Sequence, residues 1–176
     1  MKKMFFLILS GSLVFSAFSA NAQKEGRKFS AGFGIEGGIP VSDAHNSYNF
    51  TGGITARFAY LAGPGYATFT TGAVVFGPKS YADYQAKAAV QIPFKAGYKY
   101  IITGPLFVMG EVGYSVFKAY YEDANNDVIS NSTGGFTFAP SIGVQHHAFE
   151  VAVKYESIAV KGGNISNMAL RLGFNF

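Results

Sequence analysis

The last nine residues of the chain alternate strictly between two kinds of side chain. In residues 168–176, MALRLGFNF, every even position is apolar and every odd position is small or polar. Successive side chains of a β-strand point to opposite faces, so a period of two predicts a strand with one apolar face. A helix would instead separate Met168 and Leu172 from Leu170 and Phe174 on opposite faces. The strand is therefore the better interpretation.

Seven segments upstream show the same alternation, although the phase of the third is ambiguous. They are Lys28–Val41, Phe50–Leu61, Gly65–Phe76, Gln85–Tyr100, Gly104–Tyr120, Gly135–Gln145 and Phe149–Val160. With the C-terminal segment they predict eight strands, and so a single all-β domain.

The connections between these segments alternate in length, which is an independent signal. The longer, more polar ones are Ser42–Asn49, Gly77–Tyr84, Tyr121–Gly134 and Lys161–Asn164, whereas Ala62–Pro64, Ile101–Thr103 and His146–Ala148 are tight turns. Transmembrane β-barrels have short periplasmic turns and longer outer loops. We therefore expect an eight-stranded antiparallel up-and-down transmembrane β-barrel with both termini on the side of the short turns.

A soluble, lipocalin-like barrel is the alternative, and it would bury Leu170 and Phe174 and expose Arg171. Only 14% of the residues are charged, against about 25% in soluble domains. Aromatic residues also gather near the strand ends, as in the interfacial girdles of membrane barrels. They are Phe29, Tyr48, Phe50, Tyr60, Tyr66, Tyr98, Tyr100, Tyr120, Tyr121, Phe174 and Phe176.

The first 22 residues have the pattern of a cleavable signal peptide. Lys2 and Lys3 precede the apolar stretch Met4–Phe18, and Ala20-Asn21-Ala22 is a small-x-small cleavage site. The barrel domain is thus expected at 23–176, in the outer membrane of a Gram-negative cell. Residues 1–22 hold two lysines and no acidic residue, so their removal lowers the net charge from +4 to +2. That charge gives no reason to expect nucleic acid binding.

Two strands and the C-terminus resemble a known family. Residues 90–100, VQIPFKAGYKY, and 107–115, FVMGEVGYS, are similar to successive strands of the PorT-like, porin-family outer-membrane β-barrel domain. The resemblance implies the fold and the outer-membrane location and leaves the activity unassigned. The terminal Phe174 and Phe176 resemble the aromatic signal that the barrel-assembly machinery reads.

The small and polar face of the strands carries ionisable residues that would point into the barrel. They are Glu36, Arg57, Lys95, Lys99, Glu111, Glu150, Lys154, Glu156 and Arg171. The interior of an eight-stranded barrel is just wide enough for side chains to fill, and buried charges must pair. We expect a plug of salt bridges, with Glu36 between Arg57 and Arg171 and with Lys95 beside Glu111. A narrow channel or proton path is the alternative.

Other motifs give weaker signals. His45 and Ser47 invite comparison with outer-membrane lipid hydrolases, but they fall in a predicted loop and lack a carboxylate partner. Asp123–Asp127 opens like a calcium loop without its later glycine and glutamate. His146 and His147 are expected to be exposed. The sequence thus predicts a monomeric, non-enzymatic barrel without metal or cofactor, whose partners are outer-membrane lipids and the assembly machinery.

Overall fold

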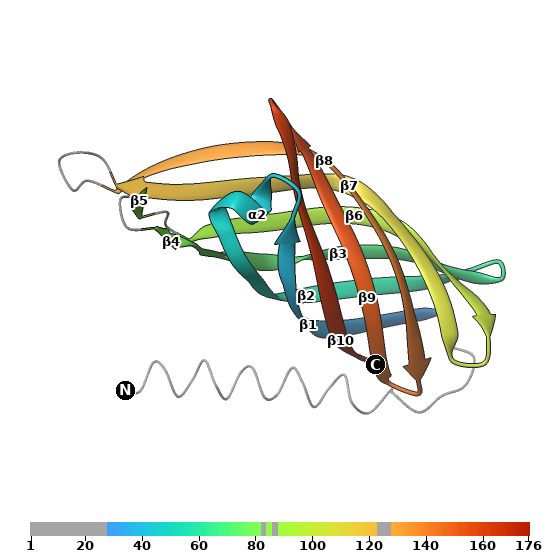
Figure 1. Cartoon of the computed structure of the whole chain (residues 1–176). Helices are drawn as coiled ribbons and strands as arrows, with labels where there is room; N and C mark the ends of the chain where they lie inside the picture. The colour runs from blue at the N-terminus through green and yellow to red at the C-terminus, as the bar shows by residue number, and fades with distance from the viewer. Residues whose placement is uncertain (1–27, 82–83, 86–87, 123–127) are drawn as a thin grey trace, which may run out of the picture.

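The chain folds into one closed barrel of antiparallel strands. The computed structural model describes residues 28–81, 84–85, 88–122 and 128–176. The barrel contains eight strands, in the order β1-β10-β9-β8-β7-β6-β3-β2 (Figure 1). They are β1 (Phe29–Val41), β2 (Tyr48–Ala62), β3 (Gly65–Pro78), β6 (Ala89–Thr103), β7 (Leu106–Glu122), β8 (Val128–His146), β9 (Phe149–Val160) and β10 (Gly163–Asn175). The expected eight-stranded antiparallel up-and-down barrel is confirmed.

The first and last strands close the barrel on each other. Their register runs from Gly32 opposite Asn175 to Val41 opposite Ser166. The ladder includes the last residue, because the backbone N–H of Phe176 donates to the carbonyl of Ala31 at 2.7 Å and the N–H of Ala31 donates to the carbonyl of Phe176 at 3.0 Å. A closed barrel has no free sheet edge, so its wall satisfies its own backbone hydrogen bonds.

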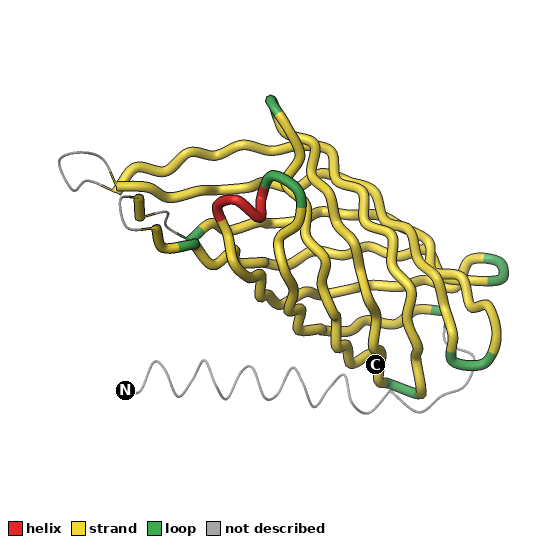
Figure 2. The backbone as a smooth tube through the Cα atoms, in the orientation of Figure 1, coloured by secondary structure: helices red, strands yellow, loops and turns green. Residues whose placement is uncertain are grey.

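The two ends of the barrel differ. The turns at Gly63–Pro64, Gly104–Pro105 and His147–Ala148 lie together with the C-terminus at one end (Figure 2). The other end, called here the loop end, holds the short helix α2 (Ala44–Ser47), the small hairpin of β4 (Ser80–Tyr81) and β5 (Tyr84–Gln85), and the far ends of β7 and β8 (Figure 1). In the part of the chain that the structure describes, no helix is long and apolar enough to cross a membrane.

One of the three predicted tight turns is misplaced. Ile101–Thr103 belongs to β6, and the turn follows at Gly104–Pro105. Gly104 has a φ of +51°, a backbone conformation that glycine adopts without steric cost and isoleucine does not. The predicted strand Gln85–Tyr100 is correspondingly shifted, since β6 begins at Ala89.

The predicted outer connections are shorter than expected. The ladder between β7 and β8 continues to Glu122 opposite Val128, so most of the predicted loop Tyr121–Gly134 is strand. The connection predicted at Lys161–Asn164 is a two-residue turn, because β10 already begins at Gly163. Backbone hydrogen bonds between strands do not depend on an apolar face. The strands therefore continue past the apolar band of the outer wall, where the alternation of apolar and polar residues in the sequence has already ended. Residues 1–22, Gln23 and Asp123–Asp127 lie outside the described residues.

The wall points its apolar side chains outward. Leu170 and Phe174 are 45% and 46% exposed, whereas Arg171 between them is 1% exposed. A soluble barrel requires the opposite arrangement, so the lipocalin-like alternative is wrong. The third segment is no longer ambiguous: Thr68, Thr70, Val74 and Phe76 of β3 all point inward and are buried.

Candidate functional site

Every ionisable residue expected in the interior is buried there. The most exposed of the nine is Glu36, at 6%. They come from six of the eight barrel strands: Glu36 from β1, Arg57 from β2, Lys95 and Lys99 from β6, Glu111 from β7, Glu150, Lys154 and Glu156 from β9, and Arg171 from β10. Each occupies an inward position of an alternating strand, so the period of two brings them together from distant parts of the chain.

Glu150 is the acidic residue that binds the most cations. Its Oε1 lies 2.5 Å from Nη1 of Arg57 and 2.7 Å from Nη1 of Arg171. Its Oε2 lies 2.6 Å from Nζ of Lys99. Charge-assisted hydrogen bonds of this length are the stronger class. One carboxylate thus holds three cations that β2, β6 and β10 contribute.

Lys154 plays the matching part among the cations. Its Nζ lies 2.5 Å from Oε2 of Glu36 and 2.8 Å from Oε2 of Glu156. Glu156 in turn accepts a hydrogen bond of 2.6 Å from Lys95. A second cluster of short contacts therefore lies beside the one that Glu150 organises.

Three longer contacts join the two clusters into a closed ring. Nε of Arg171 lies 3.8 Å from Oε1 of Glu36. On the other side, Oε2 of Glu111 lies 3.9 Å from Nη2 of Arg57 and 3.7 Å from Nζ of Lys95. Cations and carboxylates alternate around the ring in the order Glu150, Arg57, Glu111, Lys95, Glu156, Lys154, Glu36 and Arg171. Lys99 lies outside the ring, bound to Glu150, and gives the nine groups a net charge of +1.

Threonine hydroxyls fill the gaps in this ring. Thr55 accepts a hydrogen bond of 3.2 Å from Nε of Arg171 and donates one of 3.2 Å to Glu36. Thr70 accepts one of 3.1 Å from Nε of Arg57 and donates to Glu111. Both threonines therefore connect charged groups that only approach each other at 3.8–3.9 Å, which lowers the cost of burying these ions.

Two glycines make room for Arg171. A Cβ at Gly34 would lie 2.7 Å from the guanidinium carbon, and one at Gly173 would lie 2.3 Å from Nη1. Any larger residue at either position would displace the guanidinium from its partners. These glycines are thus part of the site. The sequence indicated only that small residues are abundant on the inward face, and it did not single out these two positions.

Apolar clusters lie on both sides of the ring. Toward the loop end, the rings of Phe76 and Phe117 meet edge to face at 5.2 Å, and Tyr48 packs on both. Val74, Ala89 and Ile158 complete this cluster, called here the loop-end plug. Toward the turns, Phe107 packs with Met109 and Ala152, and Nζ of Lys99 lies 3.9 Å from the centre of the Phe107 ring.

Sequence reasoning missed the loop-end plug and misplaced two residues. Tyr48 was expected in an outer aromatic girdle, but it packs inside the barrel. The expected contact between Glu36 and Arg57 is wrong as well. Arg57 lies opposite Gly32, four residues from Glu36 along β1, and it reaches Glu150 and Glu111 instead. The signal for the plug was the run Thr68, Thr70, Gly72, Val74 and Phe76, in which one face changes from polar to apolar.

The remaining motifs do not come together. His45 and Ser47 are exposed on helix α2, where residues two apart do not face each other. The rings of His146 and His147 stack edge to face at 4.2 Å beside the third turn. Among the described residues, no group of three His, Cys, Asp or Glu side chains is placed to hold a metal ion.

A closed eight-stranded barrel with an apolar outer wall and a charged interior has the architecture of the small outer-membrane β-barrels. Solved structures of that class match it. Ail, the attachment invasion locus protein of Yersinia pestis, has a TM-score of 0.63 and 15% identity, over 84% of this chain and 97% of Ail. The N-terminal β-barrel domain of Pseudomonas aeruginosa OprF has a TM-score of 0.60 and 10% identity, over 86% of this chain and all of that domain.

A third match is Neisserial surface protein A, with a TM-score of 0.56 and 13% identity over 86% of this chain and 98% of that protein. At these identities the similarity shows the fold alone. No protein-family model matches the chain, and no curated protein sequence does. The resemblance to the PorT-like family therefore stays a prediction, while the porin-type barrel is supported.

Proposed function

We propose that this protein is a non-conducting outer-membrane β-barrel, with a structural role in the membrane and a role in contacts at the cell surface. The observation that carries the proposal is the filled interior. The ring of charges joins side chains from six of the eight barrel strands, and apolar side chains pack above and below it. A water-filled path requires a continuous polar lining, which the loop-end plug interrupts.

The outer wall supports the placement in a membrane. Large apolar side chains such as Ile54, Phe136 and Val153 are 48–67% exposed. A soluble monomer does not expose so much contiguous apolar surface. Short turns at one end of the barrel and the longer β7–β8 hairpin at the other match the periplasmic and external sides of such barrels. Export would require the signal peptide 1–22, and the mass of the protein recovered from outer membranes would show whether it begins at Gln23.

The role in surface contacts rests on the loop end. The β7–β8 hairpin and helix α2 would lie outside the cell, and they expose polar side chains, among them His45, Ser130 and Ser132. Ail is named for attachment and Neisserial surface protein A for its surface position. Those names describe the other proteins, and here they support only the general role that we propose.

Planar-bilayer recording tests the proposal directly. The refolded protein should insert without producing conductance steps, while a porin of about 16 strands, which leaves an aqueous channel, serves as the positive control in the same bilayer. Insertion is checked separately by recovering the protein from the membrane. Reproducible single-channel steps from inserted protein would favour the narrow channel and overturn the filled barrel.

A further inference from the structure

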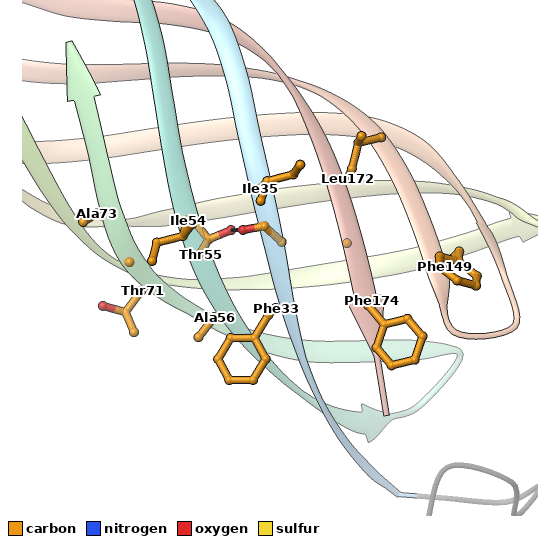
Figure 3. Close-up of a pocket in the computed structure, with 13 residues that line it drawn as sticks. Phe33, Ile35, Ile54, Thr55, Ala56, Thr71, Ala73, Phe149, Leu172 and Phe174 are labelled. Carbon is orange, nitrogen blue, oxygen red and sulfur yellow. Dashed lines mark hydrogen bonds between the residues drawn. The ribbon is translucent and has the colours of Figure 1, made fainter. Parts of the chain in front are cut away.

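The outer wall is hollowed on one side of the barrel. A groove of about 720 Å³ crosses β10, β1, β2 and β3 (Figure 3). Its floor consists of small outward side chains: Ala56 lies opposite Thr71, and the neighbouring Ala73 lies opposite Ile54. Larger side chains, including Phe33, Ile35 and Phe174, form its sides. The groove therefore results from small residues at adjacent outward positions of β2 and β3.

The same row of the wall is filled elsewhere. Thr71 lies opposite Phe94 of β6. The row continues with Tyr114 of β7 and then with Phe136 of β8, each opposite the residue before it. These three aromatic side chains are 48–57% exposed and stand out from the wall. The groove is thus a local feature of one side and not a general property of the barrel surface.

The groove begins near the turns and extends to the middle of the wall, where Ile54 of β2 lies opposite Ala73 of β3. Phe149 is the first residue of β9 after its turn, and Phe174 lies directly opposite it near the chain end. If the protein has the function proposed above, the end of the groove at Phe149 and Phe174 faces the periplasmic leaflet. The outward lining is apolar apart from the Thr71 hydroxyl, and the volume falls within the range of roughly 300–1,000 Å³ that is typical of ligand sites.

We propose that this groove holds an acyl chain of a phospholipid from the periplasmic leaflet. The inference rests on the proposed membrane function. It commits to a lipid chain because the groove continues the apolar surface that hydrocarbon would contact, and because it carries no charge for a polar ligand. A second copy of the chain fits less well, since a two-fold contact would set this hollow against itself and leave a void.

A tryptophan reporter tests the proposal, because the chain contains no tryptophan. Phe33→Trp places the reporter beside the groove, and Phe136→Trp places a matched reporter on the opposite, filled side of the wall. Both variants are folded into vesicles of phosphatidylethanolamine with brominated chains, which quench nearby indoles, and are then diluted into excess detergent. A retained chain should keep the Phe33→Trp emission quenched, while the Phe136→Trp emission recovers.

Native mass spectrometry of the same detergent samples gives a second measurement. The parent should retain one phospholipid, and the groove-filling variant with Ala56→Phe and Ala73→Phe should lose most of that bound fraction. Ala159→Phe makes one such substitution at an outward alanine of β9 away from the groove, and this variant should retain the lipid. Filling the groove thus separates a specific site from lipid that adheres anywhere on the wall.

The outcomes separate this proposal from the proposed function. Equal recovery of both tryptophan signals, or equal lipid retention in all variants, would overturn the groove as a lipid site while leaving the membrane barrel intact. Retention of a second protein copy in place of lipid would also overturn it. A parent protein that fails to fold into vesicles would instead overturn the membrane function on which the inference rests.

Discussion

Replacing Glu150 by glutamine removes the carboxylate on which three cations of the interior converge. The substitution breaks the ion pairs with Arg57 at 2.5 Å, Lys99 at 2.6 Å and Arg171 at 2.7 Å. The side chain of Glu150 is fully buried, so water cannot replace it. The net charge of the nine interior groups rises from +1 to +2, and the amide adds a donor that faces other donors.

The expected loss of stability is about 3–5 kcal/mol, the usual cost of leaving a buried charge without its partner. Arg57 and Arg171 each keep one carboxylate, at 3.9 Å and 3.8 Å, which keeps the loss from growing further. Within the part of the chain that the structure describes, Lys99 keeps no carboxylate, only Gln145 and the Phe107 ring. Lys99→Met in the same chain should therefore recover part of the loss, because contacting charges couple by roughly 0.5–3 kcal/mol.

Urea unfolding in lipid vesicles measures the parent, the two single variants and the double variant. Asp43→Asn is the matched control: it also removes one carboxylate, but from an exposed position beside helix α2, and should change stability by less than about 0.5 kcal/mol. A Glu150→Gln protein that unfolds at the parent's midpoint would show that solvent screens these charges. The interior would then be a hydrated pore, and the filled-barrel argument would fail.

Three further changes probe the wall, the plug and the end of the chain. Leu172→Arg, on the outward face, should cost about 2–4 kcal/mol in lipid, whereas Ala169→Ser on the inward face should cost little; equal tolerance in urea titrations would contradict the orientation of β10. Phe117→Ala should cost about 3–5 kcal/mol by emptying the loop-end plug, yet the charge ring below should keep bilayer conductance at baseline. Deleting Phe176 should lower the amount of folded barrel in outer membranes more than its urea stability, and normal amounts would argue against an assembly signal.

The orientation of the side chains was predictable because it depends only on the period of two. Arg171 stands between Leu170 and Leu172, and if the leucines face hydrocarbon the guanidinium has to face the interior. The same reasoning placed Lys95 and Glu111 inside on adjacent strands, where they lie 3.7 Å apart. Whether a side chain points inward or outward depends only on its own strand, so the alternation within that strand is enough to predict it.

The partners of the buried charges were less predictable. The strands of a barrel are tilted and staggered relative to one another. Residues at the same number of positions from a turn therefore lie at different heights along the barrel axis. Arg57 shows the effect, because the stagger carries it away from Glu36 and toward Glu150, whose strand is distant in sequence. Long side chains add several ångströms of reach in either direction, and no period in the sequence encodes which way they extend.

The strand ends and the plug were missed for a different reason. In the outer part of the β7–β8 hairpin polar and apolar residues are mixed, with Lys118 opposite Ser132 and Tyr121 opposite Ile129, so the sequence shows no regular alternation there. Tyr48 and Phe76 are aromatic residues near strand ends, as girdle residues are, and only the phase of their strands assigns them to the interior. An inward aromatic and an outward one look alike wherever the alternation is interrupted.

The interior charges also explain how one strand register is selected from the alternatives. A slip of one residue turns every side chain of a strand to the other face. In β9 such a slip would move Glu150, Lys154 and Glu156 into the hydrocarbon together, and Lys154 alone would cost about 2–4 kcal/mol near the midplane. An apolar interior would impose no such penalty, since both faces of the strand would then be acceptable to lipid. The ring of ions therefore adds specificity even where its net contribution to stability is small, and the strand with three of the nine charges is the one whose register it determines most firmly.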